Sequence, residues 1–186
     1  MGEEMEIDLT LNDEDATLTV ARSDSLLDVL RRSGYTGAKR GCNTGDCGFC
    51  TVIVDGDPIK SCLEPAIRLD GADVETIESL GTQDDLHPIQ AAFVDNAAPQ
   101  CGFCIPGMIM RTKGLIEDNP DPNNEEIRNA LSGNLCRCTG YEKILDAVDD
   151  AASRMARETE MAADGGQTSE AWSCSDCDCS PGGESE

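Results

Sequence analysis

The sequence has few basic residues. Its 186 residues include 14 Lys and Arg against 37 Asp and Glu, which gives a formal net charge of −23. Proteins that bind nucleic-acid phosphates need clusters of Lys and Arg, so we expect no nucleic-acid partner. Acidic residues spread over a surface keep a protein soluble, and halophilic proteins use them in this way. We therefore predict a high-salt cytoplasm, with an ordinary acidic protein as the alternative.

Long apolar segments are also missing. No stretch approaches the roughly 18 to 20 apolar residues that a membrane-spanning helix needs. Residues 1–10 have neither the basic nor the apolar region of a secretory signal. We therefore expect a cytoplasmic protein. In that reducing compartment, eleven cysteines in a chain of this size favour metal ligation over disulfides.

Aromatic residues make up only 3% of the chain, and His87 is the one histidine. A hydrophobic core must therefore be built from Ile, Leu, Val and Ala, and bound metal would add to its stability because metal binding couples to folding. His87 precedes Pro88, which is typical of the first turn of a helix. We interpret this histidine as a helix-start residue rather than a metal ligand.

Four cysteines in the first half of the chain have the spacing of a plant-type 2Fe–2S site, C-x4-C-x2-C followed by a distant C. Thiolates are the soft anionic ligands that iron–sulfur clusters need. The loop also contains Gly41, Gly45 and Gly48, so backbone N–H groups can approach the cluster sulfurs and offset their negative charge. The predicted ligands are Cys42, Cys47, Cys50 and Cys62.

A second group of cysteines combines a C-x2-C pair with a C-x-C pair, and the segment between the pairs is predicted to form two helices. On spacing alone, this group could hold a 2Fe–2S cluster or a tetrahedral structural zinc. A thioredoxin-like redox pair is a third possibility, although the βαβ context of such pairs is missing. The members of the group are Cys101, Cys104, Cys136 and Cys138.

The first part of the chain is predicted to be rich in β-structure. Alternating apolar and polar residues over 5–11 and 17–21 predict two strands joined by a turn. Ser25 and Asp28 predict a capped helix start, and Gly34 predicts the end of that helix. Further strands are expected at 51–54, from 58 to 62, and at 75–77. These elements predict a β-grasp ferredoxin-like domain over residues 1–82.

The pattern becomes helical in the second part of the chain. Pro88 and Pro106 are each expected in the first turn of a helix. Asn123 and Thr139, each followed three residues later by Glu, predict capping boxes for two more helices. We therefore expect a four-helix bundle over residues 83–158, and an α+β fold overall.

Residues 159–186 lack apolar periodicity, and we predict a disordered acidic tail there. Cys174, Cys177 and Cys179 lie in this tail, where they could bind zinc or copper or sense oxidation. A flexible tail with reduced thiols is the interpretation we favour. Trp172 could dock on a partner.

Three segments together closely resemble the iron–sulfur subunit of the molybdenum hydroxylases, the family of xanthine dehydrogenase, aldehyde oxidoreductase and carbon monoxide dehydrogenase. In chain order they are GCNTGDCGFCTV, QCGFCIPGM and LSGNLCRCTGY. The resemblance implies a second 2Fe–2S cluster, rather than zinc, in the helical domain. It also implies that this cluster lies nearer molybdenum and that the cluster of the ferredoxin-like domain lies nearer flavin. Phe49 departs from the family, in which a small residue is common at this position.

The resemblance further implies partners. They are a large molybdopterin-binding subunit and a medium FAD-binding subunit, in a hetero-oligomer for which a dimer of heterotrimers is one possible arrangement. Gln100 and Cys138 match family positions that lie against the pterin, although Gln100 could instead make only local hydrogen bonds. Electrons would pass from molybdenum through the two clusters to FAD, and no catalytic residue is expected on this chain. The substrate is not indicated.

Two other functions remain open from the sequence. One is a free-standing electron carrier with two 2Fe–2S clusters, although a simple ferredoxin has no need of a second cluster in a helical bundle. The other is a structural zinc–iron protein that serves as an assembly module.

Overall fold

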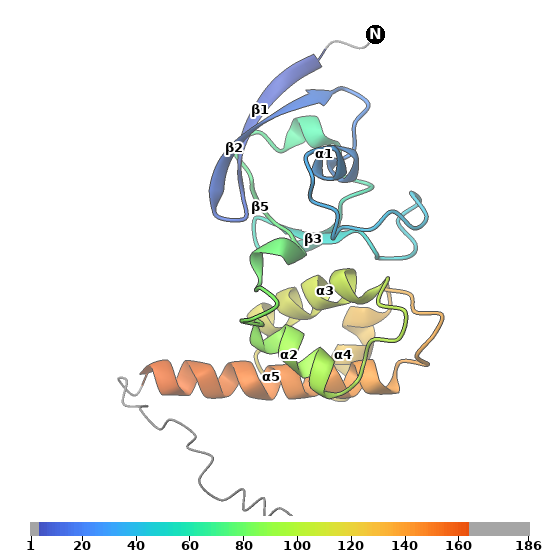
Figure 1. The fold of residues 1–186 in the computed structure, drawn as a ribbon, viewed down its shortest axis with the longest axis vertical. Coiled ribbons are helices and arrows are strands. Elements are labelled where there is room, and N and C mark those ends of the chain that lie inside the picture. Colours follow the sequence, from blue (N-terminus) through green and yellow to red (C-terminus); the bar gives the residue numbers. More distant parts are fainter. Residues whose placement is uncertain (1–3, 164–186) are drawn as a thin grey trace, which may run out of the picture.

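A computed structural model describes residues 4–163 of the chain. A β-sheet domain lies against a helical domain, with the sheet domain above the helices in Figure 1. This arrangement confirms the predicted α+β fold class. The predicted acidic tail with Cys174, Cys177 and Cys179 lies outside the described residues, apart from its first residues.

The sheet has five strands in the order β2-β1-β5-β3-β4. Strand β5 runs parallel to β1, and the other neighbouring pairs are antiparallel. Helix α1 packs on the sheet, as Figure 1 shows, and buries Leu26, Leu27 and Leu30 there. The strands are β1 (Glu4–Leu11), β2 (Glu14–Ala21), β3 (Thr51–Val54), β4 (Asp57–Lys60) and β5 (Asp73–Glu75), and the helix is α1 (Leu26–Arg32).

Two local signals in this domain work as the sequence predicts. Asn12 and Asp13 both have positive φ, 55° and 65°, which is the backbone of a two-residue hairpin turn between β1 and β2. Ser25 and Asp28 form the predicted capping box of α1. Strand β5 lies earlier than the predicted 75–77, because the Thr76 N–H leaves the sheet to donate to Asn12 Oδ1 at 2.7 Å.

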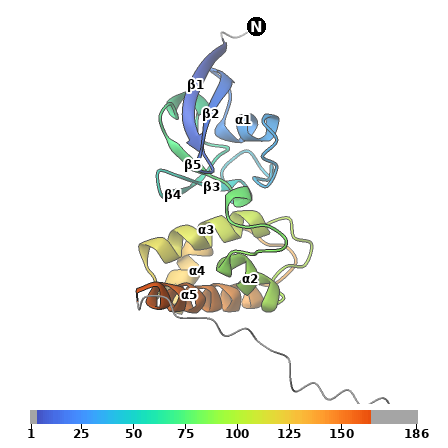
Figure 2. The ribbon, with the colours of Figure 1, turned by 60° about the vertical axis from the view of Figure 1, so that its left-hand side comes forward.

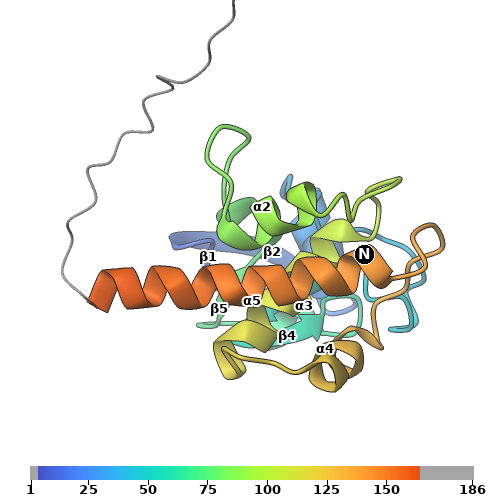
Figure 3. The same ribbon diagram turned by 90° about the horizontal axis from the view of Figure 1, so that it is seen from below.

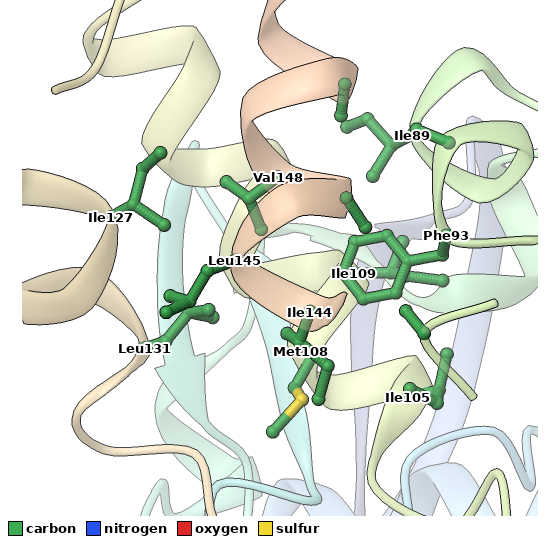
Figure 4. Packing of buried hydrophobic residues seen from close by; sticks show 14 of the residues in the cluster. Ile89, Phe93, Ile105, Met108, Ile109, Ile127, Leu131, Ile144, Leu145 and Val148 are labelled. Atoms are coloured by element: carbon green, nitrogen blue, oxygen red, sulfur yellow. The ribbon is translucent and has the colours of Figure 1, made fainter. Parts of the chain in front are cut away.

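Four helices form the second domain, as predicted. They are α2 (Pro88–Asp95), α3 (Ile105–Asp118), α4 (Asn124–Leu131) and α5 (Glu142–Ala163). Helix α5 crosses the whole underside of the domain in Figure 3. Figure 4 shows Leu145 and Val148 of α5 among side chains from the three other helices, with Phe93 as the one aromatic ring in the view.

The capping predictions had mixed outcomes in this domain. Asn123 caps α4 in a capping box with Glu126, as expected. Thr139 does not cap α5, because that helix begins only at Glu142 and the Thr139 hydroxyl instead donates to Cys136 Sγ at 3.1 Å. Helix α5 continues to Ala163, past the predicted domain end at residue 158. The domain boundaries themselves stay a prediction.

Helix α3 joins the two domains, lying directly under β3 in Figures 1 and 2. Gly107 and Gly114 make this close approach possible. A Cβ at Gly107 would lie 2.4 Å from the Gly48 carbonyl oxygen, and one at Gly114 would lie 2.7 Å from Pro58 Cγ. Near them, Lys113 of α3 forms an ion pair with Glu75 of β5 at 3.0 Å. No helix within residues 4–163 is long and apolar enough to cross a membrane.

Candidate metal centres

The first cysteine group lies in the loop between α1 and β3 and just after β4. Cys47 and Cys50 are buried, whereas Cys42 and Cys62 are half-buried. The thiols come together in two pairs, in which Cys42 contacts Cys47 and Cys50 contacts Cys62. The structure therefore brings together all four cysteines of the predicted set.

The surroundings shift the pKa values of three of these thiols. Hydrogen bonds from the Thr44 hydroxyl and N–H lower the pKa of Cys42 to about 6. Burial, together with the neighbouring Cys50 thiol, raises the pKa of Cys62 to about 11. Burial also raises the pKa of Cys47. A bound metal deprotonates a coordinating thiol outright, so iron would have to supply the charge that stabilises the buried thiolates.

The second group forms where the loop before α3 meets the loop before α5. Cys104 is buried at the N-terminus of α3 and contacts half-buried Cys136. Cys101 and Cys138 are exposed, and their sulfurs lie 3.7 Å apart. Four cysteines from distant positions again form two pairs.

Burial and neighbouring groups also shift the pKa values of thiols in the second group. Burial and the Cys136 thiol raise the pKa of Cys104 to about 12. Burial acts in the same direction on Cys136, but hydrogen bonds from the Thr139 hydroxyl and N–H outweigh it and lower the pKa of Cys136. The adjacent Cys101 thiol raises the pKa of the exposed Cys138 thiol.

Glycines shape both loops. Gly45, Gly48 and Gly102 have φ of 80°, 70° and 80°, a left-handed backbone that side chains disfavour. Gly41 serves a different purpose, since a Cβ there would lie 2.9 Å from Cys47 Sγ. Gly41, Gly45 and Gly48 are the three loop glycines that the sequence singled out.

Several residues around the second group were not predicted. The Tyr141 hydroxyl accepts a hydrogen bond from the Cys136 N–H at 2.8 Å and donates to the Asn134 carbonyl at 3.0 Å. The Asn134 side chain is buried and reaches the first cysteine loop. Both residues lie in the segment LSGNLCRCTGY, which was the only sequence signal for them.

His87 is the N-cap of α2, as its position before Pro88 predicted. Its ring Nδ1 accepts from the Ile89 N–H at 3.3 Å, and the backbone N–H of His87 donates to Gln90 Oε1 at 3.0 Å. Gln100 is exposed at the edge of the second group.

Comparison with known proteins identifies both domains. Residues 9–76 match the family model for a 2Fe-2S iron-sulfur cluster binding domain, and residues 76–149 match that for a [2Fe-2S] binding domain. Over 151 residues the chain is 45% identical to the nicotinate dehydrogenase small FeS subunit of Eubacterium barkeri, covering 81% of this chain and 96% of that one. The chain belongs to the small 2Fe–2S subunits of the molybdenum hydroxylases.

Other members extend the comparison. The aldehyde oxidoreductase of Megalodesulfovibrio gigas is 45% identical over 149 residues, which are 78% of this chain but only 16% of that protein. The solved structure of quinoline 2-oxidoreductase from Pseudomonas putida 86 superimposes with a TM-score of 0.81 at 42% identity, covering 86% of this chain and 99% of that chain. The small subunit thus occurs both as a separate chain and as part of a longer one.

Membership in this family settles what the chain does. It is an iron–sulfur electron-transfer subunit of a multi-subunit oxidoreductase, with two 2Fe–2S-binding domains, and the catalytic molybdenum site lies on a partner chain. The zinc alternative for the helical domain is therefore wrong, as is the free-standing carrier.

The thiols present fit 2Fe–2S clusters. Within residues 4–163, no three or more His, Cys, Asp or Glu side chains are arranged to hold a single metal ion. A 2Fe–2S cluster has a different requirement, because four thiolates are shared between two irons. Two pairs of thiols in each group satisfy that requirement.

Proposed function

We propose that each thiol pair holds one iron. In the ferredoxin-like domain, Cys42 and Cys47 would hold one iron, and Cys50 and Cys62 the other. In the helical domain the pairs would be Cys101 with Cys138 and Cys104 with Cys136. The single observation that carries this proposal is the pairing of thiols from distant positions, such as the 3.7 Å between Cys101 and Cys138 sulfurs.

The exposure of the ligands gives the electron path a direction. A 2Fe–2S cluster accepts and releases one electron at a time. Cys101 and Cys138 are the most exposed cysteines of the two groups, so electrons from the molybdenum site would enter there. They would then pass to the ferredoxin-like domain and leave toward FAD past Cys62, next to which Leu63 is 59% exposed.

The partners we propose are a large molybdopterin-binding subunit and a medium FAD-binding subunit in a hetero-oligomer. Exposed apolar side chains support two separate docking areas, because large apolar groups left in water often mark interfaces. Phe103 and Leu135 are 46% and 48% exposed beside the second cysteine group, and Leu63 lies beside the first. Gln100 and Cys138 would then face the pterin of the large subunit.

We also propose that the protein works in a high-salt cytoplasm. The net charge of −23 supports this, because such a surface repels itself at low salt and salt screens the repulsion. The thermal unfolding temperature of the full chain should therefore keep rising with potassium chloride concentration, beyond the concentration at which the unfolding temperature of ordinary acidic proteins stops rising. An unchanged unfolding temperature above physiological salt would contradict this proposal.

Purification of the tagged full chain from its native host tests the proposed assembly. We expect about four irons per chain from two 2Fe–2S clusters, together with molybdenum, flavin and two larger polypeptides. The same iron content without molybdenum, flavin or larger polypeptides would contradict the proposed partners and the proposed electron path. It would not contradict the proposed ligand pairs.

A further inference from the structure

The loops of the two cysteine groups meet at one buried amide. Asn134 is 3% exposed, and its Nδ2 donates to the carbonyl oxygens of Gly48 at 2.9 Å and Gly107 at 3.1 Å. Gly48 lies between Cys47 and Cys50, whereas Gly107 lies in the first turn of α3, just after Cys104. One side chain thus links the first cysteine loop to the helix that follows Cys104.

A backbone hydrogen bond lies directly beside this amide. The Leu135 N–H donates to the Cys47 carbonyl at 2.9 Å. Asn134 and Leu135 therefore contact two successive residues of the first loop, Gly48 and Cys47. The Tyr141 hydroxyl holds the same segment from the other side, through the Asn134 carbonyl and the Cys136 N–H.

Gly48 and Gly107 have no room for a side chain at this contact. A Cβ at Gly48 would lie 2.4 Å from the Gly133 carbonyl oxygen and 2.7 Å from Asn134 Cγ. A Cβ at Gly107 would lie 2.4 Å from the Gly48 carbonyl oxygen. The two loops therefore touch backbone to backbone, and the Asn134 amide is the side chain that hydrogen-bonds across the contact.

We propose that Asn134 is a positioning residue that fixes the distance and orientation between the two clusters. The inference rests on the proposed ligand sets. Removing the amide takes one donor from each of two buried carbonyl groups. The Gly48 carbonyl keeps its hydrogen bonds from the Thr51 N–H and hydroxyl, so the substitution specifically removes the bonds that cross the contact. The loops then relax apart or let water enter, so the clusters that they carry no longer keep one relative position.

Magnetic coupling between the reduced clusters measures that relative position. We would load the full chain with its clusters, reduce both, and record electron paramagnetic resonance spectra of wild type, Asn134→Ala and Gly107→Ala. We expect wild type to show splitting from the interaction of two spins. We expect both variants to lose the resolved splitting while their iron content stays at the wild-type value. The added methyl group of Gly107→Ala would push the two segments apart at the same contact. This variant therefore still tests the effect of the contact on the splitting if Asn134→Ala fails to fold.

Asn96→Ala is the matched control. The Asn96 amide also donates twice, to the Ala92 carbonyl at 2.9 Å and Asp150 Oδ2 at 2.8 Å, but within the helical domain. This control should keep the splitting. A purely structural role for Asn134 would lower iron content or stability and leave the splitting of loaded molecules unchanged.

The outcomes separate the two proposals. Wild-type splitting in both contact variants, or a wild type with both cluster signals but no splitting, would overturn the role of Asn134. A wild type without a second cluster signal would instead overturn the proposed ligand sets.

Discussion

The backbone N–H of Leu135 donates to the carbonyl oxygen of Cys47 over 2.9 Å. Cys47 is a proposed ligand in the ferredoxin-like domain, and Leu135 directly precedes Cys136, a proposed ligand in the helical domain. Covalent bonds and this hydrogen bond therefore form one continuous connection between the two ligand sets. With the proposed ligands, the domain interface would also be the path between the clusters, so mutations at the interface should affect electron transfer as well as stability.

Replacing one proposed ligand should remove one cluster and leave the other. For Cys104→Ser we expect about two irons per chain in place of about four, since each 2Fe–2S cluster would have four thiols of its own. Iron analysis and the visible absorption spectrum check this result. Cys177→Ser is the matched control, because Cys177 is in neither ligand set, and it should keep the full iron content. A full iron content in Cys104→Ser would remove Cys104 from the proposed set.

Tyr141→Phe should weaken the helical-domain site without changing its ligands. The variant loses the hydroxyl that contacts the Cys136 N–H and the Asn134 carbonyl. We expect a loss of about 1 to 3 kcal/mol in the free energy of unfolding, because buried polar groups lose their partner. Denaturant unfolding of the iron-loaded protein measures this loss.

Tyr35→Phe controls for the loss of a hydroxyl as such. Tyr35 is half-buried in the core of the sheet domain, and its hydroxyl has no hydrogen bond among residues 4–163. The two substitutions should differ clearly in their effect on stability. Equal effects would mean that the Tyr141 hydroxyl does not support the site.

His87 should make stability depend on pH. Burial lowers its pKa below the usual 6.5, and its Nδ1 caps α2 only when unprotonated. The unfolded chain therefore takes up a proton at higher pH than the folded one, and stability should fall as pH drops below about 6.5.

His87→Asn isolates this effect, since Asn caps a helix at any pH. We expect wild type to lose about 1 kcal/mol relative to this variant between pH 8 and pH 5.5, as is typical for a lost helix cap. Paired denaturation curves at the two pH values give the difference. A constant difference would show that protonation of His87 does not act on the cap.

The sequence predicted those features that depend on neighbouring residues. The capping boxes at Ser25 and Asn123 use partners three residues away, so they could be found in one segment of the chain. Thr139 has the same pattern, but its hydroxyl bonds to Cys136 Sγ, a contact that a capping rule does not consider. Cysteine spacing predicted which thiols would gather, and the structure added how they pair.

Contacts between distant segments could not be predicted from the sequence. Asn134 resembles any polar residue after a helix, because its partners Gly48 and Gly107 come from two other parts of the chain. Gly107 and Gly114 lie inside a helix, where glycine is normally unfavourable. Glycine is needed at these two positions because α3 closely approaches the sheet domain, and only the assembled fold shows that approach.

A reductive titration followed by electron paramagnetic resonance shows most directly whether this one chain holds two distinct 2Fe–2S clusters on paired thiols, in magnetic contact through the interface at Asn134. We expect two different signals, each accounting for one electron per chain, with about four irons present. A single signal with about two irons, or zinc in place of iron in the helical domain, would contradict this expectation.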